Sequence, residues 1–132
     1  MIGYVTIGAL DNEASGKFYD AVFGALGSER KLADGGWIGY GKVSDGKSFM
    51  DCHSAVCSTP FNGEPARAGN GIMIAYGAET PEAVKAAYDA GMKNGGQDEG
   101  PPGFRPPDAQ AGFYASYLRD PTGNKICVFC AV

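Results

Sequence analysis

The chain has 132 residues, of which 44% are hydrophobic and 20% are charged, as is usual for one globular domain with its own core. Its net charge of −4 gives no attraction to phosphate backbones or acidic membranes, so we expect no nucleic-acid or membrane partner. No apolar stretch is long enough to span a bilayer and no signal peptide is recognisable, which predicts a cytoplasmic protein with reduced cysteines.

The first half of the chain predicts a strand, a helix and a hairpin, in that order. Residues 2–9 alternate apolar and small side chains in the manner of a half-buried strand. Asp11 is placed as the N-cap of an amphipathic helix that ends near Gly27. Two apolar runs, residues 37–43 and 49–55, flank an Asp-Gly turn, which predicts a β-hairpin.

The second half repeats this order after a linker. Residues 57–70 are rich in Pro, Gly, Ser and Asn and lack periodicity, which indicates the linker. A strand is predicted at residues 72–78, and Thr80-Pro81 then supplies a helix N-cap and a proline at the first helical position. Two closing strands, residues 113–119 and 125–131, are joined by an Asp-Pro-Thr-Gly-Asn turn.

The two halves are copies of one pattern, so each must bury its apolar face against the other. Residues 3–9 are echoed by residues 72–78, and Tyr19-Asp20-Ala21 by Tyr88-Asp89-Ala90, at the same separation of 69 residues. The later turns are 77 residues apart, so the second copy holds eight extra residues, which we assign to a proline-rich loop at residues 100–107. A single domain of two βαβββ modules is predicted, the first over about residues 1–56 and the second over about 71–132.

These features resemble the glyoxalase/bleomycin-resistance/extradiol-dioxygenase superfamily, also called vicinal oxygen chelate proteins. The resemblance rests on the paired modules, the opening Tyr4-Val5-Thr6-Ile7-Gly8, the helical Phe18-Tyr19-Asp20-Ala21 and the closing segment 113–124, and it covers nearly the whole chain. It implies an α+β fold in which two mixed sheets curl around a shared cleft, and it implies a homodimer.

The resemblance also locates the positions that hold a metal in other members. There, a divalent ion is bound by residues of the first and last strands of each module, typically His or Gln early and Glu late. Matched to this chain, the early positions are Tyr4 and Met73, and the late positions are Met50 and Cys127. A neutral phenol and thioethers are poor ligands for such metals, so we expect no metal and no other cofactor.

The same positions suggest a binding cleft for a small molecule. Alternation along the strands places Thr6, Cys52 and Phe129 on the faces of these positions, and Met and aromatic linings suit flat organic ligands. Arg105, on the proline-rich loop, is expected to meet a carboxylate or phenolate. The predicted ligand-binding residues are Tyr4, Thr6, Met50, Cys52, Met73, Arg105, Cys127 and Phe129. The alternative is that these side chains fill the cleft as core.

Two functions follow from this cleft. The first is a metal-free protein that binds a small aromatic or amphipathic molecule, and the second is a metal-dependent lyase, isomerase or dioxygenase of the same superfamily. Fold alone does not separate these two functions, but the residues at the four positions matched to metal ligands favour the metal-free binding protein. Metal-free catalysis by Tyr4 or Arg105 is a third possibility, without a positive signal.

The cysteines and the single histidine suggest two further sites, neither of which we favour. A zinc site from Cys52-x4-Cys57 and Cys127-x2-Cys130 is disfavoured because residues three apart in a strand point to opposite faces. His53 faces away from the adjacent Cys52, so a nucleophile-base pair would require Cys127 to align with it from another strand. We expect buried thiols and a surface or hydrogen-bonded histidine.

Overall fold

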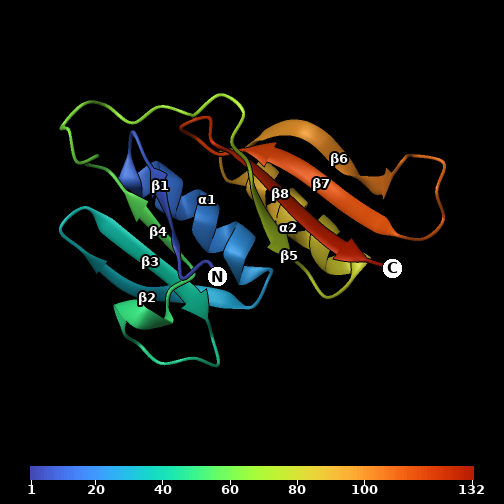
Figure 1. Cartoon of the computed structure of the whole chain (residues 1–132), viewed down its shortest axis with the longest axis horizontal. Coiled ribbons are helices and arrows are strands. Elements are labelled where there is room, and N and C mark those ends of the chain that lie inside the picture. Colours follow the sequence, from blue (N-terminus) through green and yellow to red (C-terminus); the bar gives the residue numbers. More distant parts are fainter.

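The computed structural model describes all residues 1–132 and contains two four-stranded sheets, each with one helix (Figure 1). The first module consists of β1 (Val5–Gly8), α1 (Asn12–Gly24), β2 (Ser28–Asp34), β3 (Trp37–Lys42), the short 3₁₀ helix η1 (Phe49–Asp51) and β4 (Ser54–Cys57). The second consists of β5 (Ile74–Gly77), α2 (Pro81–Lys93), β6 (Gln97–Arg105), β7 (Phe113–Arg119) and β8 (Lys125–Ala131). The strand orders β1-β4-β3-β2 and β5-β8-β7-β6 confirm the predicted α+β fold with paired βαβββ modules.

Both helices begin where the sequence predicts. The Asp11 side chain accepts hydrogen bonds from the first-turn amides of α1, and the Thr80 hydroxyl accepts one from Ala83 N at the start of α2. These caps satisfy amides that have no partner inside the helix, which fixes the starting residue. Neither helix is long and apolar enough to cross a membrane.

The predicted strand at residues 49–55 is wrong over its first part. The chain forms η1 there, and Asp51 closes the turn by accepting hydrogen bonds from the amide and hydroxyl of Ser48. The backbone of Asp51 also passes directly over Gly41, where a Cβ would collide with the Asp51 carbonyl oxygen. Pairing with β3 therefore starts only at Ser54, which lies opposite Tyr40.

The predicted loop at residues 100–107 is also wrong in part, because most of it belongs to strand β6. This strand lies at the edge of its sheet and shows register shifts on both sides of Gly100. Proline lacks an amide donor and is tolerated on edge strands and at bulges, which is how Pro101 and Pro102 fit. Arg105 is consequently held by strand pairing, opposite Phe113.

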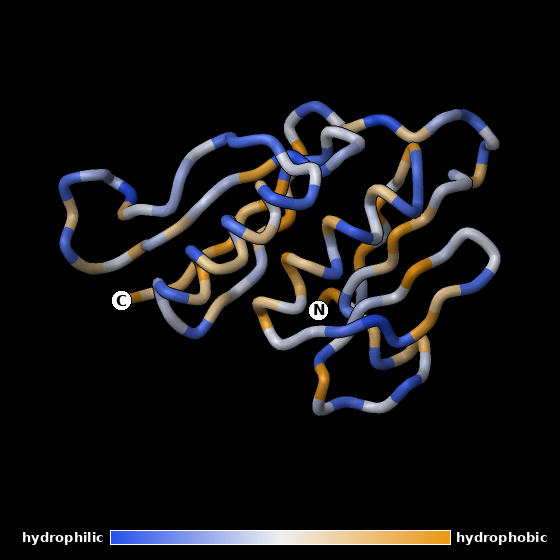
Figure 2. Tube along the Cα trace, turned by 180° about the vertical axis from the view of Figure 1, so that it is seen from behind, coloured by the Kyte–Doolittle hydropathy of each residue, from blue (hydrophilic) through white to orange (hydrophobic).

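The helix-covered faces of the two sheets meet in one hydrophobic core. It combines residues of sheet one and α1 with residues of α2 and sheet two, in a list that includes Ile7, Phe18, Tyr19, Val22, Tyr40, Val56, Val84, Leu118 and Val128. The helices approach closely at Gly91, where a Cβ would lie 2.8 Å from Leu118 and 3.0 Å from Val22. Hydrophobic residues concentrate on the central strands, whereas the helices carry both kinds and the loops are largely hydrophilic or intermediate (Figure 2).

Because the helices lie between the sheets, the opposite faces of the two sheets point away from each other (Figure 1). We call these the outer faces. The strand backbones of the two sheets stay apart, and the hydrogen bond between Ser54 of β4 and Tyr76 of β5 lies on the helix-covered side. The outer faces therefore do not form a shared cleft within one chain, in contrast to what the resemblance implied.

A buried carboxylate joins the two modules. Asp120, in the β7–β8 turn, accepts a hydrogen bond of 2.8 Å from the hydroxyl of Tyr19 in α1, and both residues are almost fully buried. The same carboxylate accepts from the amides of Thr122 and Asn124 and from the Asn124 side chain, which also donates to Gly8 O at the end of β1. Asp120 and Asn124 together thus fix the turn, α1 and β1 relative to one another.

The repeat supplies a matched test of this contact. Tyr19→Phe is expected to lower the free energy of unfolding by about 2 kcal/mol, because a buried hydrogen bond to a charged acceptor is lost. Tyr88 is the repeat equivalent of Tyr19, and its hydroxyl donates to the exposed Asp98, so Tyr88→Phe should cost less than about 0.5 kcal/mol. Urea denaturation of both variants measures the difference, and equal losses would contradict the assigned role of Asp120.

Candidate functional site

The outer face of the second sheet is an apolar surface around a buried thiol. Cys127 lies beside Ala75 on β5 and opposite Tyr117 on β7, and its side chain is fully covered. Phe113 and Phe129 stack at a tilt with ring centroids 5.2 Å apart on the same face. Met73 and Phe113 are 42% and 39% exposed, so this face remains open to a ligand in the single chain.

Arg105 brings a positive charge to this apolar surface. Its guanidinium lies 5.5 Å from the centroid of the Tyr117 ring and is positioned by hydrogen bonds to the carbonyls of Phe104 and Pro101. No carboxylate of the chain forms an ion pair with it. The neighbouring cation, Lys125, lies 5.6 Å from the same ring but has Glu99 at 3.9 Å. Arg105 is therefore a half-buried cation on an aromatic ring that lacks an acidic partner.

The outer face of the first sheet carries more aromatic side chains but is partly covered by its own chain. Tyr4 contacts Phe49 of η1 edge to face, with centroids 4.8 Å apart. The Cys52 thiol lies over Gly39, where a Cβ would come within 2.6 Å of the sulfur. Thr6 is exposed, and Trp37, the only tryptophan, lies at 39% exposure at one end of this face.

Strand pairing corrects one of the four positions that were matched to the metal ligands of other superfamily members. Thr6 lies beside Ala55 in the first sheet as Ala75 lies beside Cys127 in the second, so the equivalent of Cys127 is Ala55. Met50 instead lies on η1 with 87% exposure. The error arose because the β3–β4 connection contains η1, whereas the β7–β8 turn is short.

The donor set at these positions does not fit the metal that the superfamily resemblance implies. A phenol, an alanine methyl group, a thioether and a buried thiol occupy them, and burial raises the pKa of the Cys127 thiol. No group of three or more His, Cys, Asp or Glu side chains anywhere in the chain is arranged to hold a metal ion. Hard divalent ions prefer carboxylate and imidazole ligands, so these residues offer no site for one.

The structure divides the predicted site residues between the two outer faces. Met73, Arg105, Cys127 and Phe129 share the second face. Tyr4, Thr6 and Cys52 belong to the first face, and Met50 lies beside it on η1. The aromatic residues Phe113 and Tyr117 were missed, although their alternation along β7 was already visible in the sequence.

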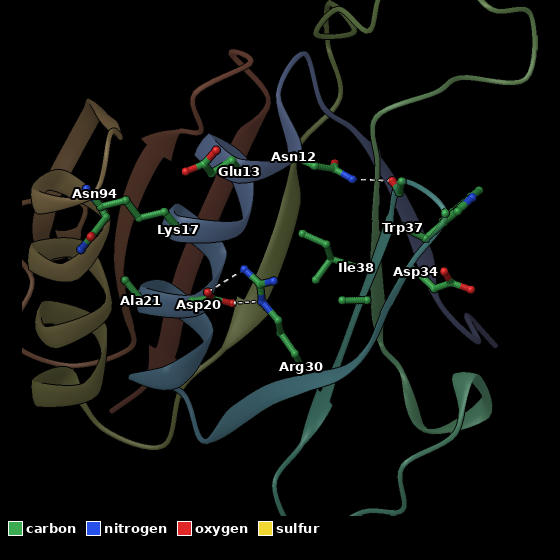
Figure 3. A pocket seen from close by; sticks show the side chains of 13 residues that line it. Asn12, Glu13, Lys17, Asp20, Ala21, Arg30, Asp34, Trp37, Ile38 and Asn94 are labelled. Atoms are coloured by element: carbon green, nitrogen blue, oxygen red, sulfur yellow. Dashed lines mark hydrogen bonds and ion pairs between the residues drawn. The ribbon is translucent and has the colours of Figure 1, made fainter.

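An open pocket of about 820 Å³ contains none of the predicted site residues. It lies between α1, the β2–β3 hairpin and Asn94 at the end of α2. Arg30 reaches across from β2 and pairs with both oxygens of Asp20 on α1, at 2.6 and 2.8 Å (Figure 3). The Arg30 cation is thereby paired within the chain. The lining also carries the charged side chains of Glu13 and Lys17.

The cysteines are separate buried thiols. All four are free and buried, with Cys127 on the outer face of β8 and Cys130 in the core under α2. The opposite orientation of these two residues agrees with the sequence argument against a zinc site.

His53 is hydrogen-bonded on both ring nitrogens. Nε2 lies 3.0 Å from Ser28 Oγ and Nδ1 lies 2.9 Å from Ser54 Oγ, so the expectation of a satisfied histidine is confirmed. The ring stacks edge to face on Phe23 in the core between the sheets. Cys127 lies on the outer face of the other sheet, so the two do not form a nucleophile-base pair.

Comparison with known proteins identifies the family. Over residues 1–128 the chain matches the family model for the Glyoxalase/Bleomycin resistance protein/Dioxygenase superfamily. It is 37% identical to a glyoxalase/bleomycin resistance protein from Albidiferax ferrireducens T118, for which a crystal structure is known. The two structures match over 98% of this chain and 98% of that chain, with a TM-score of 0.83. No protein with a curated description matches. The chain belongs to the glyoxalase/bleomycin resistance protein/dioxygenase superfamily.

More distant structures share the fold. A glyoxalase-related enzyme from Fulvimarina pelagi is 21% identical, with 96% of this chain and 86% of that chain covered and a TM-score of 0.70. A family enzyme from Burkholderia phytofirmans PsJN is 16% identical, with 99% and 98% covered and a TM-score of 0.68.

We predict that His53, the only histidine, titrates below the ordinary pKa of about 6.5. Burial lowers the pKa first, and the nearby charge of Lys42 lowers it further. The neutral ring then supports the fold fully above about pH 6.5, and this contribution is lost as the pH falls through the folded-state pKa. NMR titration of the imidazole Cε1 proton gives the midpoint, and His53→Gln should remove this part of the pH dependence. A midpoint at or above the ordinary value would contradict the described surroundings.

Proposed function

We propose that the protein binds a small aromatic or amphipathic molecule on the outer face of its second sheet, without a metal ion. The observation that carries this proposal is Arg105, a half-buried cation over the Tyr117 ring that has no acidic partner in the chain. A ligand with a carboxylate or phenolate would supply that partner, and its apolar part would lie on Met73, Phe113 and Phe129.

The open aromatic surface favours a ligand site over a filled core. A core side chain is normally covered, whereas Met73 and Phe113 are each about two-fifths exposed. The metal-dependent lyase, isomerase or dioxygenase is less well supported, because Tyr4, Ala55, Met73 and Cys127 provide no carboxylate or imidazole ligand.

We also propose that the complete site needs a second copy of the chain. The two outer faces point away from each other in one chain, yet each exposes large apolar side chains, including Tyr4, Trp37 and Phe49 on or beside the first. Contiguous apolar surface of this kind commonly marks an interface. In a homodimer, the first face of one chain would cover the second face of its partner and enclose the ligand between them.

The ligand class can be tested with paired probes. Aromatic carboxylates and phenolates should raise the melting temperature, whereas their neutral amide or methyl ether counterparts should do so less. Arg105→Ala should weaken binding of the acidic probes by about tenfold or more, because a hydrogen-bonded charge pair is lost. Calorimetric titration measures the affinities.

Arg67→Ala is the matched control, since Arg67 is exposed in the linker and lies beside Gly8 and Ala66 instead of the second outer face. It should leave every affinity unchanged. The proposal fails if no aromatic acid binds, or if Arg105→Ala and Arg67→Ala behave alike.

The dimer can be tested through the single tryptophan. If a second copy covers the first outer face, acrylamide quenching of Trp37 should decrease as the protein concentration rises through the association range. Sedimentation velocity should show the shift from monomer to dimer over the same range. A monomer with unchanged quenching at all concentrations would rule out this arrangement.

A further inference from the structure

A second cavity, of about 720 Å³, lies at the junction of the modules and is unrelated to the outer faces. Its walls come from the end of α1, the start of β2, the end of β3, His53 before β4, and β5 with the turn that follows it. Phe23, Leu26 and Tyr76 form its apolar part. Its volume is within the range of small-molecule sites.

A continuous hydrogen-bonded chain crosses the wall of this cavity. Ser28 Oγ lies 3.0 Å from His53 Nε2, His53 Nδ1 lies 2.9 Å from Ser54 Oγ, and Ser54 Oγ lies 3.0 Å from the Tyr76 hydroxyl. Ser54 is fully buried, whereas the other three residues line the cavity. The hydrogen-bond network therefore ends at Ser28 on one side and at Tyr76 on the other, and both of these residues line the cavity.

The number of hydrogens requires all the hydrogen bonds of this network to run in one direction, from Tyr76 toward Ser28 or the reverse. Three hydroxyl groups and one neutral imidazole carry four N–H or O–H hydrogens, and the three internal hydrogen bonds use three of them. One end consequently donates into the cavity while the other end has a free acceptor. If Ser28 donates outward, His53 must carry its proton on Nε2 and accept from Ser54 on Nδ1, and Ser54 must accept from Tyr76.

The cavity also carries one charge of each sign. Lys42 lies at the end of β3, and Glu79 lies in the turn between β5 and α2. Both side chains are exposed, and neither forms an ion pair in the chain. The remaining titratable groups of the lining are neutral near pH 7, because burial lowers the pKa of His53 and raises that of Tyr76 to about 12.

We propose that this cavity binds a small zwitterion with an apolar side group, the chemistry of an amino acid. The ligand carboxylate accepts from the Ser28 hydroxyl near Lys42, and its ammonium group lies toward Glu79. The apolar side group packs on Phe23, Leu26 and Tyr76. This site is independent of the proposed function on the outer face of the second sheet.

The only histidine makes the test specific. Phenylalanine or leucine, added to the full chain, should shift the His53 imidazole signals in a saturable manner. Phenylacetate, which lacks the ammonium group, and phenethylamine, which lacks the carboxylate, should each bind more weakly. In the bound state the ¹⁵N shifts should show the proton on Nε2.

Surface variants keep the test independent of folding. Lys42→Gln and Glu79→Gln should each weaken phenylalanine binding by about threefold, the size expected for one exposed charge contact. Lys85→Gln and Glu82→Gln, exposed on α2, are the matched controls and should have no effect. Ser28→Ala should weaken binding by about tenfold through loss of a hydrogen bond to a charged group, whereas Ser116→Ala, at another buried serine, should not.

Several results would overturn the proposal. These are the absence of a saturable shift with either amino acid, equal affinities in the cavity variants and their controls, or a bound histidine protonated on Nδ1. Arg105→Ala separates this site from the outer face. If Arg105→Ala abolished amino-acid binding while Ser28→Ala left it intact, the ligand would be on the outer face.

Discussion

The hydrogen bond between the buried Asp120 carboxylate and the Tyr19 hydroxyl is the contact on which the arrangement of the two modules depends. A carboxylate is tolerated in such a place only when its oxygens are satisfied, and Thr122 and Asn124 complete the set. Because Asn124 also donates to Gly8 O, the turn of the second module is fixed to the first strand of the chain. The hydrogen bonds of Asp120 specify how the two modules are oriented, and the surrounding apolar core excludes water from these bonds.

This orientation has a direct consequence for function. The helix-covered faces are used for the core, so the outer faces are left with apolar and aromatic side chains and with Arg105. The same packing also brings the start of β4 next to β5, which places Ser54 and Tyr76 in hydrogen-bonding contact beside the junction cavity. Superfamily membership explains the modules, whereas both proposed sites follow from what the core leaves accessible.

The accuracy of the sequence predictions depended on whether a signal was local. Both N-caps and the strands β7 and β8 were predicted correctly, because capping residues, alternation and a short turn act over a few residues. Met50 was misplaced because the count from the turn assumed equal loops in both copies. Strand β6 was missed because its prolines indicate a loop unless the strand is known to lie at an edge.

The sequence by itself determined the two βαβββ modules, the superfamily and the absence of His or Glu at Tyr4, Met73 and Cys127. These depend on residue identity and on short-range periodicity. Only the tertiary structure decided that Ala55 is the fourth position, that Arg105 has no acidic partner, and that the two outer faces point apart. Those features depend on loop lengths and on contacts between residues distant in sequence, which no local pattern records.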